Sequence, residues 1–462
     1  MHEEMTPFPG GVDALTGEVL REPELEELSR RLLEKSRPIT GKKKRGTIDG
    51  VDPSDLAQTG WGILFAESDP RSGEILEALK PLLDHRRAQA GSLYRQYVGS
   101  DGYLEGERKL DFLARYDAGP GPVDPKLIPH YLLLAGSPEQ IPYGFQYGLD
   151  HQHAVGRIFF ETLEEYRSYA ASVVAAETAL PLSARKVAFF GPVQDDPTRF
   201  SHRSLLRPLA EHLRPRQDCQ IRELVGEQAT KSALSQLLHG DEKPNLLFTA
   251  GHGVFYRSGH SRQLDRQGAL VCQDWPGEKC PPEPEHVFAA EDVNGARLDG
   301  LLAFLFACNS AGTPDRGDFA PEDKELRQAS PRPFVSGLAR KLLGRGALAV
   351  VGHVERVWRC SFLWRETGAK PQAFMDTLGR LLDGKPLGWA MEPLSDRFAD
   401  LSSCLSALLE DHYLGLLDEE QSIVELWTAC RDARNYVIVG DPAVRLFTPA
   451  SPPPPRRVMR GG

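Results

Sequence analysis

Several features that would place a chain in a familiar class are missing from this sequence of 462 residues. No apolar run reaches the roughly 18 residues that a membrane-spanning helix needs, so we expect no contact with a membrane. The N-terminus, MHEEMTPFPGG, lacks a basic region followed by an apolar stretch, which predicts no secretory signal peptide. The seven cysteines are odd in number and form no CxxC pair, which favours free thiols in a reducing cytoplasm over a disulfide framework.

The chain also lacks an excess of positive charge. Its formal net charge of −10 argues against a protein that binds nucleic acid through its global charge. Hydrophobic residues make up 40% of the chain and charged residues 26%, a balance typical of globular proteins with an apolar core. The length exceeds what one compact core usually holds, so we expect two domains or one enlarged domain.

What the chain does contain is a long alternation of apolar runs and helical patterns. This alternation predicts βαβ units, and therefore an α/β fold with a mostly parallel sheet flanked by helices. One series begins at Trp61, and a second series begins after Pro181. We divide the chain into a polar N-terminal tail, two successive α/β subdomains and a disordered Pro-rich tail, at residues 1–55, 56–180, 181–447 and 448–462. The basic cluster Lys42–Arg45 in the first tail is interpreted as a solvated loop, with a processing site as the alternative.

Two of the predicted strands end at residues that can carry chemistry. The run 246–250 leads into His252, and the run 305–307 leads into Cys308. Because parallel strands present their carboxyl ends at one edge of a sheet, we expect the imidazole and the thiol to form a Cys-His dyad there. A thiolate is the nucleophile that attacks a peptide carbonyl near neutral pH, and His252 is the candidate base. The alternative is a structural pair, a satisfied loop histidine and a buried cysteine.

Gly253 follows the histidine directly, and a glycine allows a backbone N–H to approach a substrate without a Cβ in the way. We therefore predict an oxyanion hole made by the backbone N–H groups of Gly253 and Cys308.

Around these residues the sequence resembles a known family. The segments 250–253 (Ala-Gly-His-Gly) and 306–310 (Phe-Ala-Cys-Asn-Ser) are similar to the His and Cys boxes of caspase-fold (clan CD) cysteine peptidases, in their CHAT and gingipain branches. The spacing of 56 residues is close to the roughly 50 found in caspases. The resemblance extends over roughly residues 60–447 and includes Tyr131–Gly136, Ile141–Pro142, Leu149–Asp150, Val155–Ile158 and Ile438–Ala443.

The resemblance implies two tandem caspase-like subdomains, of which the second is catalytic. It also implies a cysteine endopeptidase that cleaves protein substrates through a thioester acyl-enzyme, without a cofactor. Relatives in this clan often act as regulated proteases, which implies a role in bacterial stress or antiviral defence and an activating partner or ligand that the sequence does not identify. The alternatives are a peptide ligase or transpeptidase on the same dyad, and a catalytically silent interaction module.

The sequence departs from the family where the base is oriented. Gingipains place an acidic residue after the first catalytic strand, whereas the corresponding turn here is Gly191-Pro192-Val193-Gln194. The residue that orients His252 is therefore open, and a backbone carbonyl is our expectation.

Substrate recognition is expected in the loop that follows this turn. Asp195 or Asp196 would favour a basic P1 residue, whereas Arg199 or Arg203 would favour an acidic one. A solvated charged loop is the alternative. The resemblance also places a substrate-binding wall at Glu355 and Trp358.

No metal site is expected, although two groups of residues resemble one. Asp150, His151 and His153 lack further ligands in the sequence. The second group, Cys272, Cys280 and His286, lacks a fourth ligand for zinc.

Overall fold

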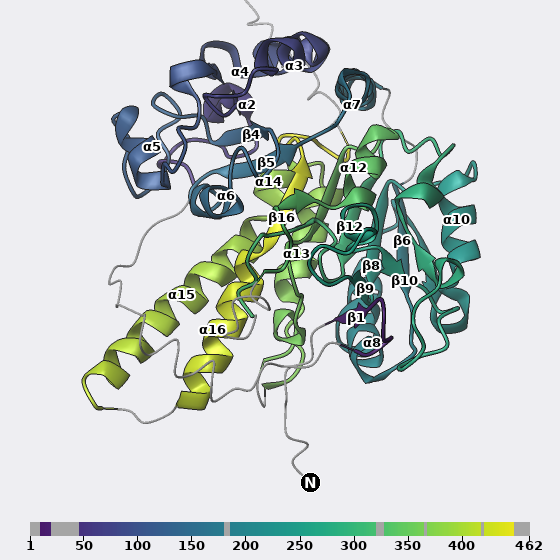
Figure 1. Cartoon of the computed structure of the whole chain (residues 1–462). Coiled ribbons are helices and arrows are strands. Elements are labelled where there is room, and N and C mark those ends of the chain that lie inside the picture. Colours follow the sequence, from purple (N-terminus) through teal and green to yellow (C-terminus); the bar gives the residue numbers. More distant parts are fainter. Residues whose placement is uncertain are drawn as a thin grey trace, which may run out of the picture.

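The computed structural model of this chain describes residues 10–19, 46–179, 185–319, 328–364, 367–416 and 420–447. Its main element is a ten-stranded sheet with helices on both faces, which confirms the predicted α/β class (Figure 1). From edge to edge the strands are β3 (Tyr94–Tyr97), β2 (Trp61–Leu64), β4 (Tyr131–Ala135), β5 (Ala154–Ile158), β16 (Tyr436–Gly440), β15 (Ala349–His353), β12 (Leu302–Phe306), β8 (Leu246–Ala250), β6 (Arg185–Gly191) and β7 (Cys219–Val225). The predicted tail 448–462 and the basic cluster Lys42–Arg45 lie outside the described residues.

The sheet consists of two parallel halves that meet at one antiparallel pair. Strands β3, β2, β4, β5 and β16 share one direction, and β15, β12, β8, β6 and β7 share the other. The last strand of the chain, β16, therefore joins the two halves, parallel to β5 and antiparallel to β15. Both predicted subdomains contribute to one continuous sheet, and the boundary between residues 180 and 181 stays a prediction.

Helices cover the sheet because successive side chains of a strand point to opposite faces. In the first half, Ile63 lies in the apolar cluster that includes the helices 72–78, 80–90 and 163–178, whereas Leu64 lies in the cluster with the helices 109–115 and 143–149. The helices of this half are α2 (Leu56–Thr59), α3 (Ser72–Ala78), α4 (Lys80–Ala90), α5 (Lys109–Arg115), α6 (Tyr143–Leu149) and α7 (Leu163–Thr178). Those of the second half are α8 (Asp196–Ser201), α9 (Arg207–Leu213), α10 (Lys231–His239), α11 (Gln263–Arg266), α12 (Gly337–Gly344), α13 (Gln372–Leu382), α14 (Leu387–Ala390), α15 (Glu392–Tyr413) and α16 (Glu420–Arg434).

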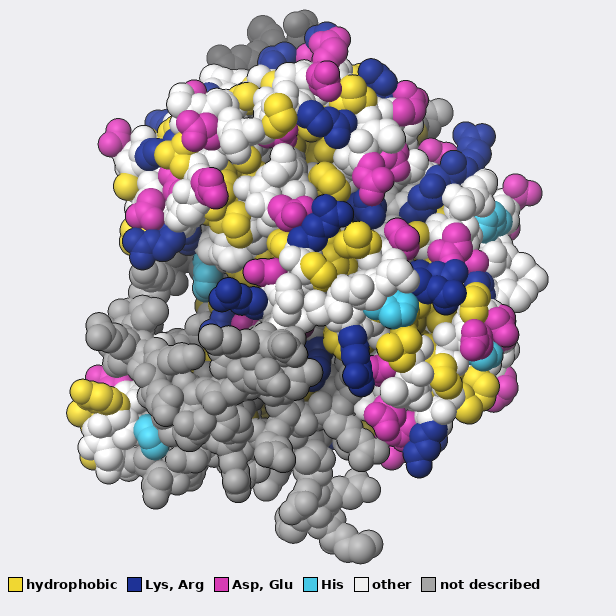
Figure 2. All heavy atoms as spheres, viewed as in Figure 1, with side chains coloured by type: hydrophobic (Ala, Val, Ile, Leu, Met, Phe, Trp, Pro, Cys, Tyr) yellow, Lys and Arg dark blue, Asp and Glu magenta, His cyan; other side chains and the backbone are white. Residues whose placement is uncertain are grey.

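Helices α15 and α16 lie side by side and extend away from the sheet (Figure 1). No helix in the described ranges is both long and apolar enough to cross a membrane. On the upper part of the face in Figure 2, acidic and basic side chains are interspersed rather than grouped by sign. The expectation that nucleic acid is not a partner stays a prediction.

A small second sheet lies beyond the carboxyl edge of the second half. Its order is β1 (Gly11–Asp13), β9 (Gly253–Phe255), β10 (Leu270–Val271) and β11 (Val287–Phe288), and a separate pair is formed by β13 (Gly312–Thr313) and β14 (Phe334–Val335). The region 1–55 was expected to be a polar tail, but its residues 10–19 are structured and Val12 is fully buried. A strand of three residues is too short to give a periodic pattern, which is why the sequence did not predict it.

A buried ion cluster lies at the end of β16 and connects it to the N-terminal elements of the same half of the sheet. Asp441 accepts hydrogen bonds from Trp61 Nε1 at 2.9 Å and from Arg86 Nε at 2.7 Å. The same guanidinium makes two hydrogen bonds to Glu177, at 2.7 and 2.8 Å. Burial opposes ionisation of Glu177, but Arg86 and His85 hold its pKa at about 2. The cluster ties the N-terminal half of the sheet to the end of the last strand.

Replacing Arg86 with methionine therefore destabilises the fold by about 3–5 kcal/mol, because it removes the guanidinium that the buried carboxylates of Asp441 and Glu177 share. Arg87→Met is the matched control, since the ion pair of Arg87 with Asp84 is exposed and contributes little to stability. Urea unfolding of both variants measures the difference. Equal midpoints for the two variants would show that the buried cluster contributes no net stability.

Candidate active site

The register of two neighbouring strands places His252 and Cys308 together. Strands β8 and β12 are parallel and adjacent, with Ala250 paired to Phe306. His252 and Cys308 each follow that pair by two residues, so both lie just beyond the same edge of the sheet. Gly253 approaches so closely that a Cβ placed on it would lie 2.0 Å from the carbonyl oxygen of Cys308. The two predicted strand ends therefore do meet.

The orienting partner of His252 is a carboxylate, and the expectation of a backbone carbonyl is wrong. Oδ2 of Asp195 lies 2.6 Å from Nε2 of His252. Asp195 is the N-cap of α8, and its Oδ1 accepts hydrogen bonds from the backbone N–H and the hydroxyl of Thr198. The cap fixes one carboxylate oxygen and directs the other towards the imidazole.

The sequence does contain a pattern that predicts this arrangement, but the pattern lies just after the turn 191–194, where the acidic residue was expected. Asp195, with Pro197 and Thr198 after it, has the pattern of a helix start, because proline is tolerated in the first turn of a helix. The orienting acid is therefore the N-cap of the helix that follows the turn rather than a residue of the turn itself. Asp195, predicted as a substrate-binding residue, instead contacts the candidate base.

Asp195 and His252 each favour the charged form of the other. Burial by itself would lower the pKa of His252, but the carboxylate of Asp195 raises it above its ordinary value, and the carbonyl of Gly10 acts in the same direction. Burial would likewise raise the pKa of Asp195, but His252 and Thr198 hold it well below its usual range. Nδ1 of His252 is buried and, within the described ranges, has no hydrogen bond of normal geometry. Asp195 thus fixes Nε2, and Nδ1 is the ring nitrogen that is left to accept a proton.

The thiol of Cys308 lies in a closed environment. Cys308 is 0% exposed, and His252 is 1% exposed. Sγ accepts a hydrogen bond from the backbone N–H of Val357 at 3.3 Å. Burial raises the pKa of Cys308 to about 12, so the thiol is protonated in this arrangement.

The first predicted oxyanion donor holds a carbonyl in this structure. The N–H of Gly253 donates to the backbone oxygen of Gly10 at 3.1 Å. The role of the second donor, the N–H of Cys308, stays a prediction.

A mostly apolar pocket adjoins Gly10 at this site. Its aromatic walls come from the end of β12, from α8 and from the segment after β15, and its lining is Gly10, Pro197, Phe200, Ser201, Phe306, Val357, Trp358, Arg359 and Phe362. Of the six residues predicted to bind substrate, only Trp358 lines it. Arg359 is the one charged residue in this lining. None of the four charged residues expected to pair with P1 lines this pocket, and the P1 preference stays a prediction.

The other predicted substrate-binding residues have structural partners. Asp196 forms an exposed ion pair with Arg199 at 3.0 Å, and the guanidinium of Arg203 lies over the ring of Phe200. Glu355 is buried, and its carboxylate accepts the backbone N–H of Asp318 at 3.0 Å.

The backbone of Glu355 also has a structural role. It has a positive φ of 79°, and its carbonyl accepts the N–H of Asn309 at 2.6 Å. Glu355 therefore shapes the loop after Cys308.

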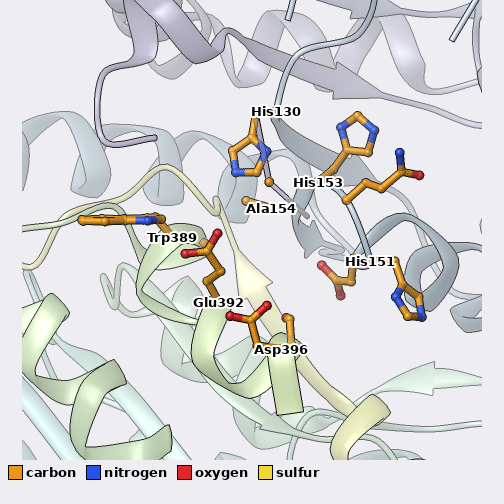
Figure 3. A pocket seen from close by; sticks show the side chains of 12 residues that line it. His130, His151, His153, Ala154, Trp389, Glu392 and Asp396 are labelled. Carbon is orange, nitrogen blue, oxygen red and sulfur yellow. The ribbon is translucent and has the colours of Figure 1, made fainter. Parts of the chain in front are cut away.

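The residues that resembled metal ligands do not gather into a metal site. Figure 3 shows a separate pocket whose lining includes His130, His151 and His153 as well as Glu392 and Asp396. His151 stacks on Phe398, and burial lowers the pKa of His153 to about 3. Within the described ranges, no group of three or more His, Cys, Asp or Glu could hold a metal ion, in this pocket or at the second group that had resembled zinc ligands.

Comparisons with known proteins give distant likenesses. No protein-family model matches the chain, and no curated protein matches it. Among solved structures, the complex of Porphyromonas gingivalis RgpB pro- and mature domains is similar at 15% identity and a TM-score of 0.48, over 85% of this chain and 81% of that one. A structure described as a protease is similar at 13% identity and a TM-score of 0.47, over 85% of this chain and 79% of that one. The Saccharomyces cerevisiae separase–securin complex is similar at 11% identity and a TM-score of 0.32, over 71% of this chain and 16% of that one. With TM-scores below 0.5, these likenesses carry no argument about activity, which must come from the geometry of the site.

Proposed function

We propose that this chain is a cysteine peptidase of caspase-like fold, with Cys308 as nucleophile, His252 as base and Asp195 as the residue that orients the base. One observation carries the proposal. The two strand ends bring a thiol and a carboxylate-paired imidazole to the same edge, beside a backbone N–H that already holds a peptide carbonyl.

Each residue then has a defined part in the reaction. His252 accepts the thiol proton, and Sγ of Cys308 attacks the carbonyl carbon of the scissile bond. The N–H groups of Gly253 and Cys308 stabilise the oxyanion. When the C–N bond breaks, the imidazolium gives its proton to the leaving amine, and a thioester remains on Cys308. Water attacks the thioester with His252 as base, which releases the acid and restores the thiol. Asp195 stabilises the imidazolium throughout.

Two other functions use the same residues differently. A peptide ligase would give the thioester to an amine instead of water, and an interaction module would not use Cys308 chemically at all. A role in bacterial stress or antiviral defence, a cytoplasmic location and an activating partner are implied by the family resemblance alone and stay predictions.

The test is a comparison of products from a tagged peptide library incubated with the wild-type chain or with Cys308→Ala and read by mass spectrometry. Cleavage by the wild type alone supports a peptidase, whereas new amide bonds would replace it with a ligase. Cys430→Ala is the matched control, because Cys430 is also buried but lies on α16. Identical products from wild type and Cys308→Ala would rule out both enzymes and leave the interaction module.

A further inference from the structure

Residues 10–13 lie against the candidate active site. Strand β1 pairs in parallel with β9, the strand that begins directly after His252, and Gly11 is paired to Gly253 (Figure 1). Val12 is fully buried in an apolar cluster with Val254 and Trp275. Asp13 closes the following turn by accepting the backbone N–H groups of Leu15 and Thr16. The segment is therefore held at this place by packing as well as by backbone pairing.

Gly10, just before this strand, makes the two backbone hydrogen bonds that a peptidase gives to the residue it acylates. Its N–H donates to the carbonyl of Val357 at 2.9 Å. Its carbonyl oxygen accepts the N–H of Gly253, the predicted oxyanion donor, at 3.1 Å. Val357 also donates its own N–H to Sγ of Cys308, so one residue contacts both the nucleophile and the peptide.

The surroundings of Gly10 favour a small residue at this place. A Cβ added to Gly10 would meet Cγ1 of Val357 at 3.4 Å and the carbonyl oxygen of Gly251 at 3.6 Å, which are ordinary van der Waals contacts. Alanine therefore fits, and larger side chains must turn into the apolar pocket that adjoins Gly10.

From this arrangement, and resting on the proposed peptidase activity, we infer that the Gly10–Gly11 peptide bond is a self-cleavage site. Sγ of Cys308 forms a bond to the carbonyl carbon of Gly10, and the C–N bond to Gly11 breaks. The thiol proton passes through His252 to the amine of Gly11. Water then hydrolyses the thioester, which gives a carboxylate at Gly10 and restores the thiol.

The cut opens the site for other peptides. Before it, the side chains of Cys308 and His252 are fully buried, so no separate peptide reaches them. After it, Gly11–Asp13 remain paired with β9, while the place of Gly10 on Val357 and Gly253 becomes free for the acyl residue of another chain. Cleavage of separate substrates then follows self-cleavage after a lag, and glycine and alanine are accepted at P1.

Intact-mass spectrometry of the full chain over time tests this inference. The wild type loses residues 1–10 and gains an N-terminus at Gly11, whereas Cys308→Ala keeps its full mass. The first-order rate constant of the cut is independent of protein concentration, because each chain cuts its own bond. Gly10→Pro removes the N–H that binds Val357 and slows the cut about tenfold or more. Gly10→Ala is the matched control and is still cut.

A peptide spanning Phe8 to Asp13, supplied separately, tells the inference apart from the proposed function. If the wild type cleaves this peptide while its own N-terminus stays intact, the self-cleavage site is refuted and the peptidase stands. A cut of the chain elsewhere, including at Lys42–Arg45, refutes the assignment of Gly10. If neither the peptide nor the chain is cut by the wild type, the peptidase itself is refuted.

Discussion

Replacing Asp195 with asparagine lowers kcat for peptide cleavage by about 10²- to 10⁴-fold. The carboxylate stabilises the imidazolium that forms when His252 takes the thiol proton, and asparagine carries no charge to do so. The fold is expected to survive, because asparagine is as good an N-cap as aspartate and keeps an oxygen for the N–H of Thr198. The loss therefore reports on the base and not on helix α8.

The pH profile of the same variant gives a second readout. In the wild type, burial alone would lower the pKa of His252, and Asp195 raises it above its ordinary value. Because a base must be neutral to accept a proton, kcat/KM rises as the pH increases through this pKa. Without the carboxylate, only the carbonyl of Gly10 still opposes the effect of burial, so the pKa of His252 falls and the acid limb of the Asp195→Asn profile moves to lower pH. A merely structural role for Asp195 would leave the limb in place.

Asp196→Asn is the matched control for both measurements. It makes the same chemical change one residue along the chain, at an exposed side chain whose partner is Arg199. Its kcat and its pH profile are expected to stay within about twofold of the wild type, since exposed ion pairs contribute little. Equal losses in the two variants would contradict the assignment of Asp195.

The parts of the fold that the sequence predicts well are those governed by long apolar runs. The run 246–250 became a central strand as expected, because a strand buried on both faces has to be apolar throughout. The edge strand β3 carries polar residues, so its pattern did not stand out. Helix α16 was not predicted either.

The site was predictable where chemistry follows a strand end and not where it depends on a contact between distant segments. His252 and Cys308 were recognised as candidates from the sequence, because each follows the end of an apolar run. Asp195 lies in a charged loop that looks solvated, and only the approach of β8 to β6 makes it a partner of the histidine. Gly10 precedes a strand of three residues whose pairing with β9 spans more than half the chain.

The Gly-Asp-Pro segment at the end of the chain has a structural explanation. Gly440 has a φ of +130°, and a Cβ on it would lie 2.9 Å from Ala349 of the antiparallel neighbour β15. Asp441 holds the buried cluster with Arg86 and Trp61. The motif therefore fixes the strand that joins the two halves of the sheet.

Replacing Gly253 with alanine abolishes cleavage and destabilises the fold. The added Cβ would lie 3.0 Å from the nitrogen of Cys308 and 2.0 Å from its carbonyl oxygen, and the second distance is one that real Cβ atoms do not adopt. Because these are backbone atoms, the turn that carries His252 and the turn that carries Cys308 have to move apart. Overpacking of this kind costs about 1–3 kcal/mol, and displacement of an oxyanion donor costs about 10²- to 10³-fold in kcat.

Gly251→Ala separates this effect from a general intolerance of the turn. Gly251 lies on the other side of His252, and a Cβ there would meet the Pro192 ring at 3.3 Å, which a shift of a few tenths of an ångström relieves. Thermal unfolding and peptide cleavage of both variants are the measurements. Gly251→Ala is expected to keep most of its activity and nearly the wild-type Tm. Gly253→Ala is expected to lose its activity and to unfold at a lower Tm. Full activity in Gly253→Ala would mean that the backbones at His252 and Cys308 are not in contact, which would remove the geometric basis of the dyad and of the oxyanion hole together.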